Sequence, residues 1–306
     1  MTETSRYALV LTADPQRRAI SQAHTAAALG VLNDAVDLSH IAVTEGSPGA
    51  AWRAEFPAKG PTKAQEVRDG LAQVLSAQPI DVNVVSADPA TMRKKLLVAD
   101  MESTIIEQEM LDELGDLIGK RTEMQAITAL AMRGELDFEM SLKERVSMLA
   151  GLDASVLETV AVHMTMMPGA ETLIATMKAN GAYCALVSGG FTFFTERIAR
   201  LVGFDEHQAN TLEIVDGKIT GRVLDPILGR EAKLEALQRM ARVHNFDMAL
   251  TLAVGDGAND IAMLSEAGLG VAFRAKPKVR AATNASGAVV THGDLTALLH
   301  LQGYDA

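Results

Sequence analysis

Two kinds of hydrophobic pattern divide the chain near residue 87. In the first part, short apolar runs alternate with amphipathic segments, and Ile80, Val82 and Val84 repeat with the period of two that is typical of a half-buried strand. The pattern predicts the order strand, helix, strand, strand, helix, strand, which is the split βαβ arrangement. The expected strands are 7–11, 35–43, 50–56 and 80–85. The expected helices are 16–29, closed by Gly30, and 62–75, capped by Thr62.

Beyond residue 95 the apolar runs are continuous, as in strands that are buried on both faces. Helical segments separate them, which predicts a parallel sheet covered on both sides. The five runs are 96–99, 183–187, 250–254, 270–273 and 288–291. Residues 106–162 have an almost entirely helical pattern rich in methionine, and Asp216-Gly217 indicates a hairpin. We therefore predict an α/β protein, with a small α+β domain over 1–86 and a larger domain over 87–306 that carries a helical cap at about 107–165.

Composition narrows the class of protein. The chain has 306 residues, of which 48% are hydrophobic and 22% charged, and 28 Lys and Arg stand against 39 Asp and Glu, a net charge of −11. This charge disfavours binding to duplex nucleic acid or to an anionic membrane. The one cysteine, Cys184, permits no intrachain disulfide, and neither a signal peptide nor a spanning segment is visible. We expect a cytoplasmic protein with a small-molecule substrate and no nucleic-acid or membrane partner.

The candidate chemistry lies at the carboxyl ends of the predicted parallel strands, where such sheets bind ligands. Asp100 follows the first of these strands, Ser188-Gly189-Gly190 follows the second, and Gly255 to Asp260 follows the third. Asp100 and Asp256 are oxygen ligands suited to a hard cation such as Mg²⁺, and Lys233 offers a point charge to a phosphate. This combination suggests phosphoryl transfer through an aspartyl-phosphate, with Asp100 as the nucleophile.

These groups resemble, in the same order, the four motifs of the haloacid dehalogenase (HAD) superfamily of phosphatases: residues 100–104, Ser188-Gly189, Lys233 and residues 255–260. Residues 138–146, Phe-Glu-Met-Ser-Leu-Lys-Glu-Arg-Val, are similar to the cap segment of the phosphoserine phosphatases. The resemblance runs from Leu96 to the C-terminus, and the N-terminal segment is similar to the ACT-type domains that some of these enzymes carry. It implies a HAD-like Rossmannoid core with a helical cap, preceded by an ACT-like domain.

The resemblance also implies a role for each matching residue. Asp100 is expected to attack phosphorus, with Glu102 as general acid and base. Mg²⁺ is expected to bind Asp100, the backbone carbonyl of Glu102 and Asp256, with Asp260 in support. The residues expected to hold the substrate are Ser188, Gly189 and Lys233 at the phosphoryl oxygens, Asn259 beside them, Glu109 at the ammonium group, Arg145 at the carboxylate, and Met132 and Phe138 as a shield.

One residue departs from the family pattern. Most phosphatases of the superfamily have Asp where this chain has Glu102, whose side chain is one methylene longer but has a similar intrinsic pKa. The acid/base role requires that the backbone or the side-chain conformation absorb this extra length.

Arg145 is unusual for a reason that does not depend on the resemblance. It shares an apolar helical face with Phe138, Leu142 and Leu149, where a lone cation is costly unless it is paired. Either an internal carboxylate or an anion of the ligand is expected to pair with it, and the cap resemblance favours the ligand.

The leading interpretation is a Mg²⁺-dependent phosphoserine phosphatase that releases L-serine. The alternative is a HAD phosphotransferase, or a phosphatase for another small phosphate ester such as phosphohomoserine, since water and alcohol acceptors need nearly the same residues. The N-terminal domain is interpreted as an amino-acid sensor or a dimerisation module. Its two-layer form leaves a sheet face or edge to cover, so we expect a homodimer through it.

Overall fold

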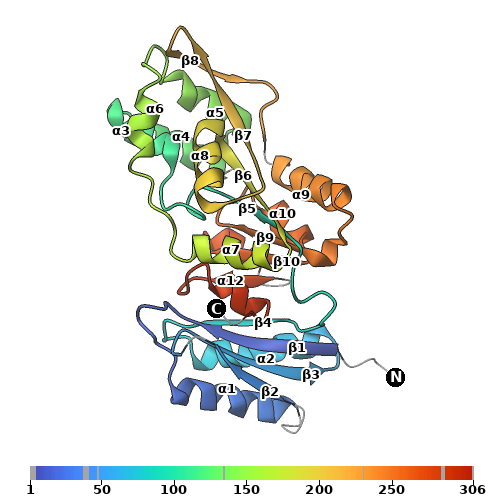
Figure 1. Ribbon diagram of the computed structural model, residues 1–306. Helices are drawn as coiled ribbons and strands as arrows, with labels where there is room; N and C mark the ends of the chain where they lie inside the picture. Colours follow the sequence, from blue (N-terminus) through green and yellow to red (C-terminus); the bar gives the residue numbers. More distant parts are fainter. Residues whose placement is uncertain are drawn as a thin grey trace.

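Two β-sheets organise the chain in the computed structural model, which describes residues 5–36, 41–46, 48–133, 135–229, 231–283 and 287–304. Residues 5–86, here called the N-terminal unit, contain a four-stranded sheet. Residues 96–304, the C-terminal unit, contain a seven-stranded sheet with a group of helices at one end. Figure 1 shows the N-terminal unit at one end of the molecule and these helices at the other.

The N-terminal unit has the predicted order of elements. They are β1 (Ser5–Thr12), α1 (Gln22–Ala35), β2 (Ala42–Glu45), β3 (Ala51–Ala58), α2 (Pro61–Val74) and β4 (Asp81–Ser86). The strands lie side by side in the order β2-β3-β1-β4, and every neighbouring pair is antiparallel. Leu9 and Leu11 point to the face covered by α1 and α2, where they pack with Leu32 and Leu71. The alternation of strand side chains therefore defines two buried faces.

Four boundaries predicted for this unit are wrong. The first helix begins at Gln22 rather than residue 16, because residues 14–18 form a turn in which the Asp14 carboxylate and carbonyl accept backbone N–H groups. It continues past Gly30, which faces open space, because Ala28 and Leu32 are buried on either side. The strand predicted at 35–43 is reduced to β2, since Ala35 is still helical and residues 37–40 lie outside the described residues. Gly60, and not Thr62, precedes the first residue of α2.

The C-terminal unit contains the predicted parallel sheet. Its strands are β5 (Leu96–Ala99), β6 (Tyr183–Phe191), β7 (Glu206–Val215), β8 (Lys218–Leu224), β9 (Thr251–Gly255), β10 (Leu269–Phe273) and β11 (Ala288–Val290). They lie in the order β11-β10-β9-β5-β6-β7-β8, and all neighbours are parallel except β7 and β8. The β7–β8 hairpin turns at Asp216 and Gly217, which both have positive φ, as the sequence predicts.

Helices cover both faces of this sheet. Leu96 and Val98 of β5 face α9 (Ala232–Val243), α10 (Ile261–Glu266) and α11 (Pro277–Thr283). Leu97 and Ala99 face the opposite way, toward α7 (Ala170–Ala179), α8 (Thr192–Val202) and α12 (Ala297–Leu301). The continuous apolar runs of the sequence thus correspond to strands buried on both sides.

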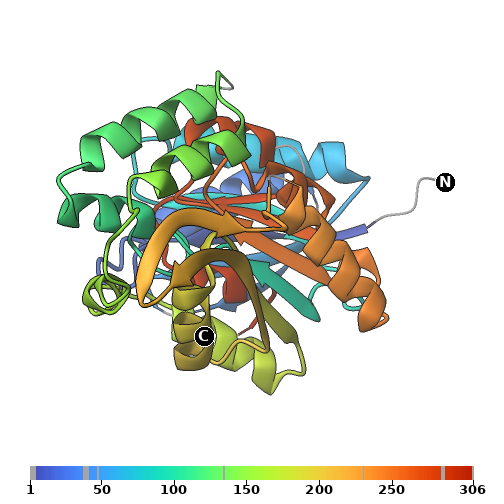
Figure 2. The ribbon, with the colours of Figure 1, turned by 90° about the horizontal axis from the view of Figure 1, so that it is seen from above.

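The predicted helical cap lies between β5 and α7 in the sequence. It consists of α3 (Met110–Leu117), α4 (Arg121–Arg133), α5 (Phe138–Ser147) and α6 (Val156–Ala161). Seen from above, α3, α4 and α5 lie across one end of the sheet (Figure 2). The cap therefore covers the strand ends that carry the candidate chemistry.

The second face of the N-terminal sheet is also covered. Ala8 and Val10 of β1 join the same apolar core as Leu298 and Leu301 of α12. The sequence analysis expected a face or an edge of this sheet to be left for a second copy of the chain. For the face this is wrong, because α12 covers it.

Strand β4 is fastened to the C-terminal unit by side chains. The Asn83 amide donates to the carbonyl of Val289 at 2.9 Å and accepts its N–H at 2.8 Å. The Asp81 carboxylate accepts the backbone N–H groups of residues 291–293 at 2.8–3.2 Å. Burial raises the pKa of Asp81, and these N–H groups partly offset that shift. We call this contact the β4–β11 junction.

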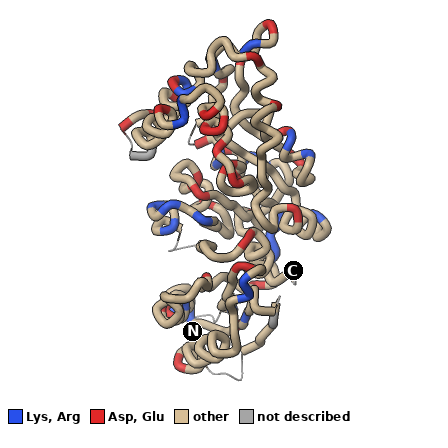
Figure 3. The backbone as a smooth tube through the Cα atoms, turned by 90° about the vertical axis from the view of Figure 1, so that its left-hand side faces the viewer, with Lys and Arg blue, Asp and Glu red and all other residues tan. Residues whose placement is uncertain are grey.

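Charged groups of both signs are spread over the two units (Figure 3). None of the helices in the described part of the chain has the length and apolar character of a membrane-spanning segment.

Candidate active site

Three buried carboxylates meet at the carboxyl end of the parallel sheet. Asp100 follows β5, Asp256 follows the neighbouring strand β9, and Asp260 precedes the first residue of α10. One oxygen from each lies within 4.8 Å of the others. Gly255 permits this approach, because a Cβ there would overlap the Asp260 carboxylate. The sequence prediction that Asp100 and Asp256 converge is thus matched by the geometry.

Lys233 reaches this cluster from the first turn of α9. Its Nζ lies 2.7 Å from Asp100 Oδ1 and 2.5 Å from Asp260 Oδ1, and the residue is 3% exposed. Burial alone would lower the pKa of Lys233, but the two carboxylates outweigh it and raise the pKa above its usual value. The lysine is therefore a fixed positive charge beside the nucleophile candidate.

The carboxylates are short of positive charge even with this lysine present. Burial raises the pKa of Asp100 well above its usual range, against the pull of Lys233, and Asp260 and Asp256 raise it further. Burial also raises the pKa of Asp256 to about 6, although Lys276 Nζ lies 3.5 Å from its Oδ2. A further cation at this position would stabilise the ionised cluster.

The donor set fits a hard divalent cation. All three candidate ligands are carboxylates, which suit Mg²⁺ or Ca²⁺ and not a soft metal. Asp100, Asp256 and Asp260 are the residues that would hold it, and the expected contribution of the Glu102 carbonyl stays a prediction.

Glu102 lies at the start of the cap. Its Oε1 accepts the N–H of Met110, the first residue of α3, at 2.9 Å. Burial raises the pKa of Glu102 to about 8, and the nearby negative charge of Glu109 contributes. A carboxyl group with such a pKa holds its proton at neutral pH, which is the state that a general acid needs. Ser103 Oγ in turn donates to Glu109 Oε1 at 2.8 Å.

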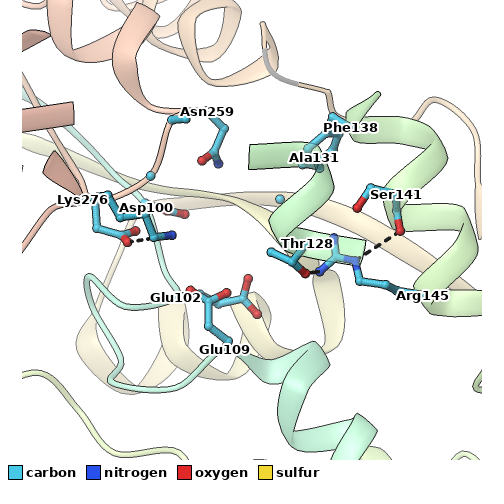
Figure 4. A pocket seen from close by; sticks show the side chains of 14 residues that line it. Asp100, Glu102, Glu109, Thr128, Ala131, Phe138, Ser141, Arg145, Asn259 and Lys276 are labelled. Carbon is cyan, nitrogen blue, oxygen red and sulfur yellow. Dashed lines mark hydrogen bonds and ion pairs between the residues drawn. The ribbon is translucent and has the colours of Figure 1, made fainter. Parts of the chain in front are cut away.

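Arg145 faces the same space from α5 (Figure 4). Its Nη1 donates to Thr128 Oγ1 at 3.1 Å and its Nε to the Ser141 carbonyl at 3.2 Å. Burial lowers the pKa of this guanidinium, against the opposite pull of Glu102, Asp112 and Glu109. No carboxylate of the described residues forms an ion pair with it, so the internal partner considered from the sequence is not found in this part of the chain.

These groups line one cavity of about 140 Å³ between the sheet and the cap. Figure 4 shows Asp100 on the sheet side, Arg145 and Phe138 on the cap side, and Glu102 and Glu109 below. The residues predicted from the sequence that line the cavity are Asp100, Glu102, Glu109, Phe138, Arg145, Gly189, Asp256 and Asn259.

The remaining predicted residues lie elsewhere or are not described. Lys233 and Asp260 contact Asp100 or each other without lining the cavity. Ser188 is buried, and its Oγ accepts the N–H of Gly190 at 2.9 Å. Met132 belongs to α4, but its side chain falls outside what the structure describes.

Three polar side chains of the cavity lining are absent from the sequence prediction: Lys276, Thr128 and Ser141. Lys276 follows β10 by three residues, so the strand-end rule that found Asp100 and Asp256 extends to it. Thr128 and Ser141 carry no comparable signal, because their place depends on how α4 and α5 pack against each other.

The family model of the haloacid dehalogenase-like hydrolases matches residues 97–265, a span that contains Asp100, Lys233 and the 255–260 motif. The chain belongs to the haloacid dehalogenase-like hydrolases. The superfamily resemblance and the predicted α/β fold are therefore confirmed.

Relatives of this hydrolase include several phosphoserine phosphatases. It is 46% identical over 230 residues to the phosphoserine phosphatase of Streptomyces coelicolor, a match that covers 75% of this chain and 56% of that protein. A solved HAD family hydrolase from Salmonella enterica serovar Typhi aligns with 98% of this chain and 99% of its own, with a TM-score of 0.83 and 28% identity. A solved phospho-aspartyl intermediate analogue of phosphoserine phosphatase is 38% identical and aligns with 68% of this chain and 98% of its own, with a TM-score of 0.63.

This hydrolase is shorter than some of the relatives it matches. It spans 56%, 66% and 63% of the lengths of the relatives from Streptomyces coelicolor, Mycobacterium tuberculosis and Vibrio cholerae.

Proposed function

We propose that this hydrolase is a Mg²⁺-dependent phosphoserine phosphatase, which converts O-phospho-L-serine and water to L-serine and phosphate. The observation that carries the proposal is the division of the cavity into two ends. Asp100, with Lys233 beside it, suits a phosphoryl group, whereas Glu109 and Arg145 offer one charge of each sign to an amino acid. The names of the curated relatives support the same substrate.

In the first step, a carboxylate oxygen of Asp100 attacks phosphorus while the bond from phosphorus to the seryl oxygen breaks. The electron pair of that bond goes to the seryl oxygen, which takes the proton of the Glu102 carboxyl and leaves as serine. Lys233 orients Asp100 and favours its ionised form, since its ammonium lies 2.7 Å from the carboxylate. Because the pKa of Glu102 is raised to about 8, its carboxyl group still carries this proton at neutral pH.

In the second step, the Glu102 carboxylate accepts a proton from water, and the water oxygen attacks phosphorus. The bond between Asp100 and phosphorus breaks, its electron pair returns to the carboxylate, and phosphate leaves. Glu102 is then protonated again, so both groups return to their starting states.

Mg²⁺ is the cation that we propose for the carboxylate cluster. When bound, it offsets the repulsion between the Asp100 carboxylate and the anionic phosphoryl group. Asp100, Asp256 and Asp260 provide its side-chain ligands, since their oxygens lie within 4.8 Å of one another.

The cap is proposed to recognise the amino-acid part of the substrate. Arg145 exchanges its neutral partners Thr128 and Ser141 for the substrate carboxylate, and Glu109 meets the ammonium group. Phe138 is proposed to shield the cavity on the cap side, where its ring lies against Gly189; a Cβ on this glycine would lie 3.3 Å from the Phe138 Cζ.

A panel of phosphate esters tests the proposal. Phosphate release is measured from phosphoserine, phosphothreonine, phosphohomoserine and phosphoethanolamine, with Mg²⁺ present and then chelated. We expect phosphoserine to have the highest kcat/KM and activity to disappear on chelation. Asp100→Asn is expected to lose activity, and release of phosphate at the parent rate by this variant would refute the mechanism. A higher rate with another ester, or phosphate transfer to added homoserine, would instead support the alternative activities.

We also propose that the protein is a homodimer that pairs through the edge strand β2 of the N-terminal unit. Ala42, Val43 and Thr44 are exposed, and β2 has only β3 as a neighbour in the described sheet. Light scattering on the parent and on Val43→Pro tests this, because proline removes an edge N–H. A monomeric parent, or a dimer unchanged by the substitution, contradicts the proposal.

A further inference from the structure

Gly190 lies against the carboxylate of Glu102. It belongs to β6 and is buried, and a Cβ built on it would lie 3.0 Å from Glu102 Oε2 and 3.1 Å from both Cδ and Oε1. These distances are shorter than ordinary van der Waals contact. The absence of a side chain at residue 190 is therefore what allows the acid to occupy this position.

The backbone gives no other reason for glycine here. Gly190 is not among the glycines with positive φ, so its conformation is open to alanine. Its N–H donates to Ser188 Oγ at 2.9 Å and is thus already used within β6. What distinguishes glycine from alanine at this position is space alone.

Glu102 is fixed from a second direction as well. Its Oε1 accepts the Met110 N–H at 2.9 Å, which ties the carboxylate to the start of α3. The side chain therefore lies between a donor from the cap and the bare backbone of β6. A Cβ on residue 190 would push the carboxylate by a few tenths of an ångström, and this contact is the far end of a flexible side chain that can give way.

We propose that Gly190 is a positioning residue for Glu102. The two residues form a size-matched pair, because the missing side chain of Gly190 leaves the space that the longer side chain of Glu102 occupies. This inference rests on the proposed function, in which Glu102 moves the proton. It explains how a glutamate serves where most of the superfamily has aspartate.

The test compares Gly190→Ala in two backgrounds. In the parent, we expect kcat for phosphoserine to fall about 10- to 100-fold, because a small displacement of an acid/base group removes part of its contribution. KM and the thermal midpoint are expected to change little. In the Glu102→Asp background, whose shorter acid leaves room for the methyl group, the same substitution should change kcat by less than about threefold. Gly30→Ala, at an exposed helical glycine with no atom near the added methyl, is the matched control.

A second measurement separates positioning from a general loss of structure. With 4-nitrophenyl phosphate, whose leaving group needs no proton, Gly190→Ala should still release a burst of one nitrophenolate per site before slow turnover, because only the second step then needs Glu102. A crystal structure of the variant should show the Glu102 carboxylate displaced and its contact with Met110 lengthened.

Three results would overturn the inference: an equal loss of kcat in both backgrounds, an unmoved carboxylate in the variant, or loss of the burst together with a lower thermal midpoint. A parent that fails to hydrolyse phosphoserine would refute the proposed function instead. The pair remains testable in that case by 4-nitrophenyl phosphate turnover and by crystallography.

Discussion

Replacing Lys233 by methionine is expected to destabilise the metal-free protein in a pH-dependent way. The lysine is 3% exposed and contacts two carboxylates, Asp100 at 2.7 Å and Asp260 at 2.5 Å. Methionine has similar length and keeps the apolar packing of the side chain. The substitution therefore removes the charge and little else.

The magnitude follows from the burial and the distances. At an effective dielectric constant of about 20, each contact is worth about 6 kcal/mol of Coulomb attraction, most of which offsets the desolvation of the buried charges. Removing one partner of a buried pair typically costs about 3–5 kcal/mol, because the other charges remain buried without compensation. We expect a loss of this size in the free energy of unfolding at pH 8.

The loss should be smaller at pH 5. Without Lys233, the pKa of Asp100, which burial already raises, rises further above its value in the unfolded chain. The folded state then binds more protons than the unfolded state, so stability falls as the pH rises from about 4 upward. At low pH Asp100 is protonated, and the missing cation matters less.

Urea unfolding followed by circular dichroism, in the presence of a chelator at pH 5 and pH 8, measures both effects. Lys178→Met is the matched control, since Lys178 pairs with Asp205 at 2.6 Å near the surface and should contribute less than about 1 kcal/mol. A loss below about 1 kcal/mol for Lys233→Met at pH 8, or an equal loss at both pH values, would refute the argument.

Three further predictions concern the substrate, the metal and the fold. Arg145→Met should raise KM for phosphoserine at least about tenfold and change KM for phosphoethanolamine, which lacks the carboxylate, only slightly; steady-state kinetics that show equal changes would contradict its role. Burial raises the pKa of Asp256 to about 6, so below this pH a binding Mg²⁺ ion must displace a proton. The Mg²⁺ affinity measured by calorimetry should therefore weaken by up to about tenfold per pH unit below that value. An affinity that does not change with pH would contradict the role of Asp256 as a ligand. Asp81→Ala leaves buried N–H groups without their acceptor and should lower the free energy of unfolding by about 2–3 kcal/mol in chemical denaturation. The control Asp34→Ala, at an exposed residue, should lower it by at most about 0.5 kcal/mol. Equal losses for the two variants would contradict a stabilising role of the β4–β11 junction.

Much of the candidate site could be predicted because it depends on local sequence. Asp100 and Asp256 each follow a continuous apolar strand, and parallel neighbours bring their carboxyl ends to the same edge. The same rule applies to Lys276 after β10, where a cation ends the strand instead of an acid. Lys276 therefore carries the same positional signal in the sequence as the two acids.

Other features depend on contacts between distant parts of the chain. Arg145 was expected on an apolar face, but its partners Thr128 and Ser141 follow from the packing of α4 against α5. The role of Gly190 in β6 depends on its contact with the side chain of Glu102, which follows the neighbouring strand β5. Neither contact has a periodicity that a single sequence could reveal.

The errors in the N-terminal unit have a similar origin. Gly30 is a plausible helix end by local propensity, yet the buried Leu32 keeps the next turn helical. The coverage of the second sheet face by α12 could not be predicted either, because the contacting residues lie more than 200 positions apart, as the hydrogen bonds of Asn83 illustrate.

The β4–β11 junction also constrains the order in which the chain can mature. A ribosome makes Asp81 some 210 residues before the backbone groups that satisfy it. Until residues 291–301 have been made, the sheet of the N-terminal unit keeps one apolar face and the polar side chains of β4 in contact with water. Such a partly folded chain is prone to association with other chains. Newly made chains are therefore prone to aggregate until α12 packs against the sheet. Aggregation during expression should depend on how quickly translation reaches α12.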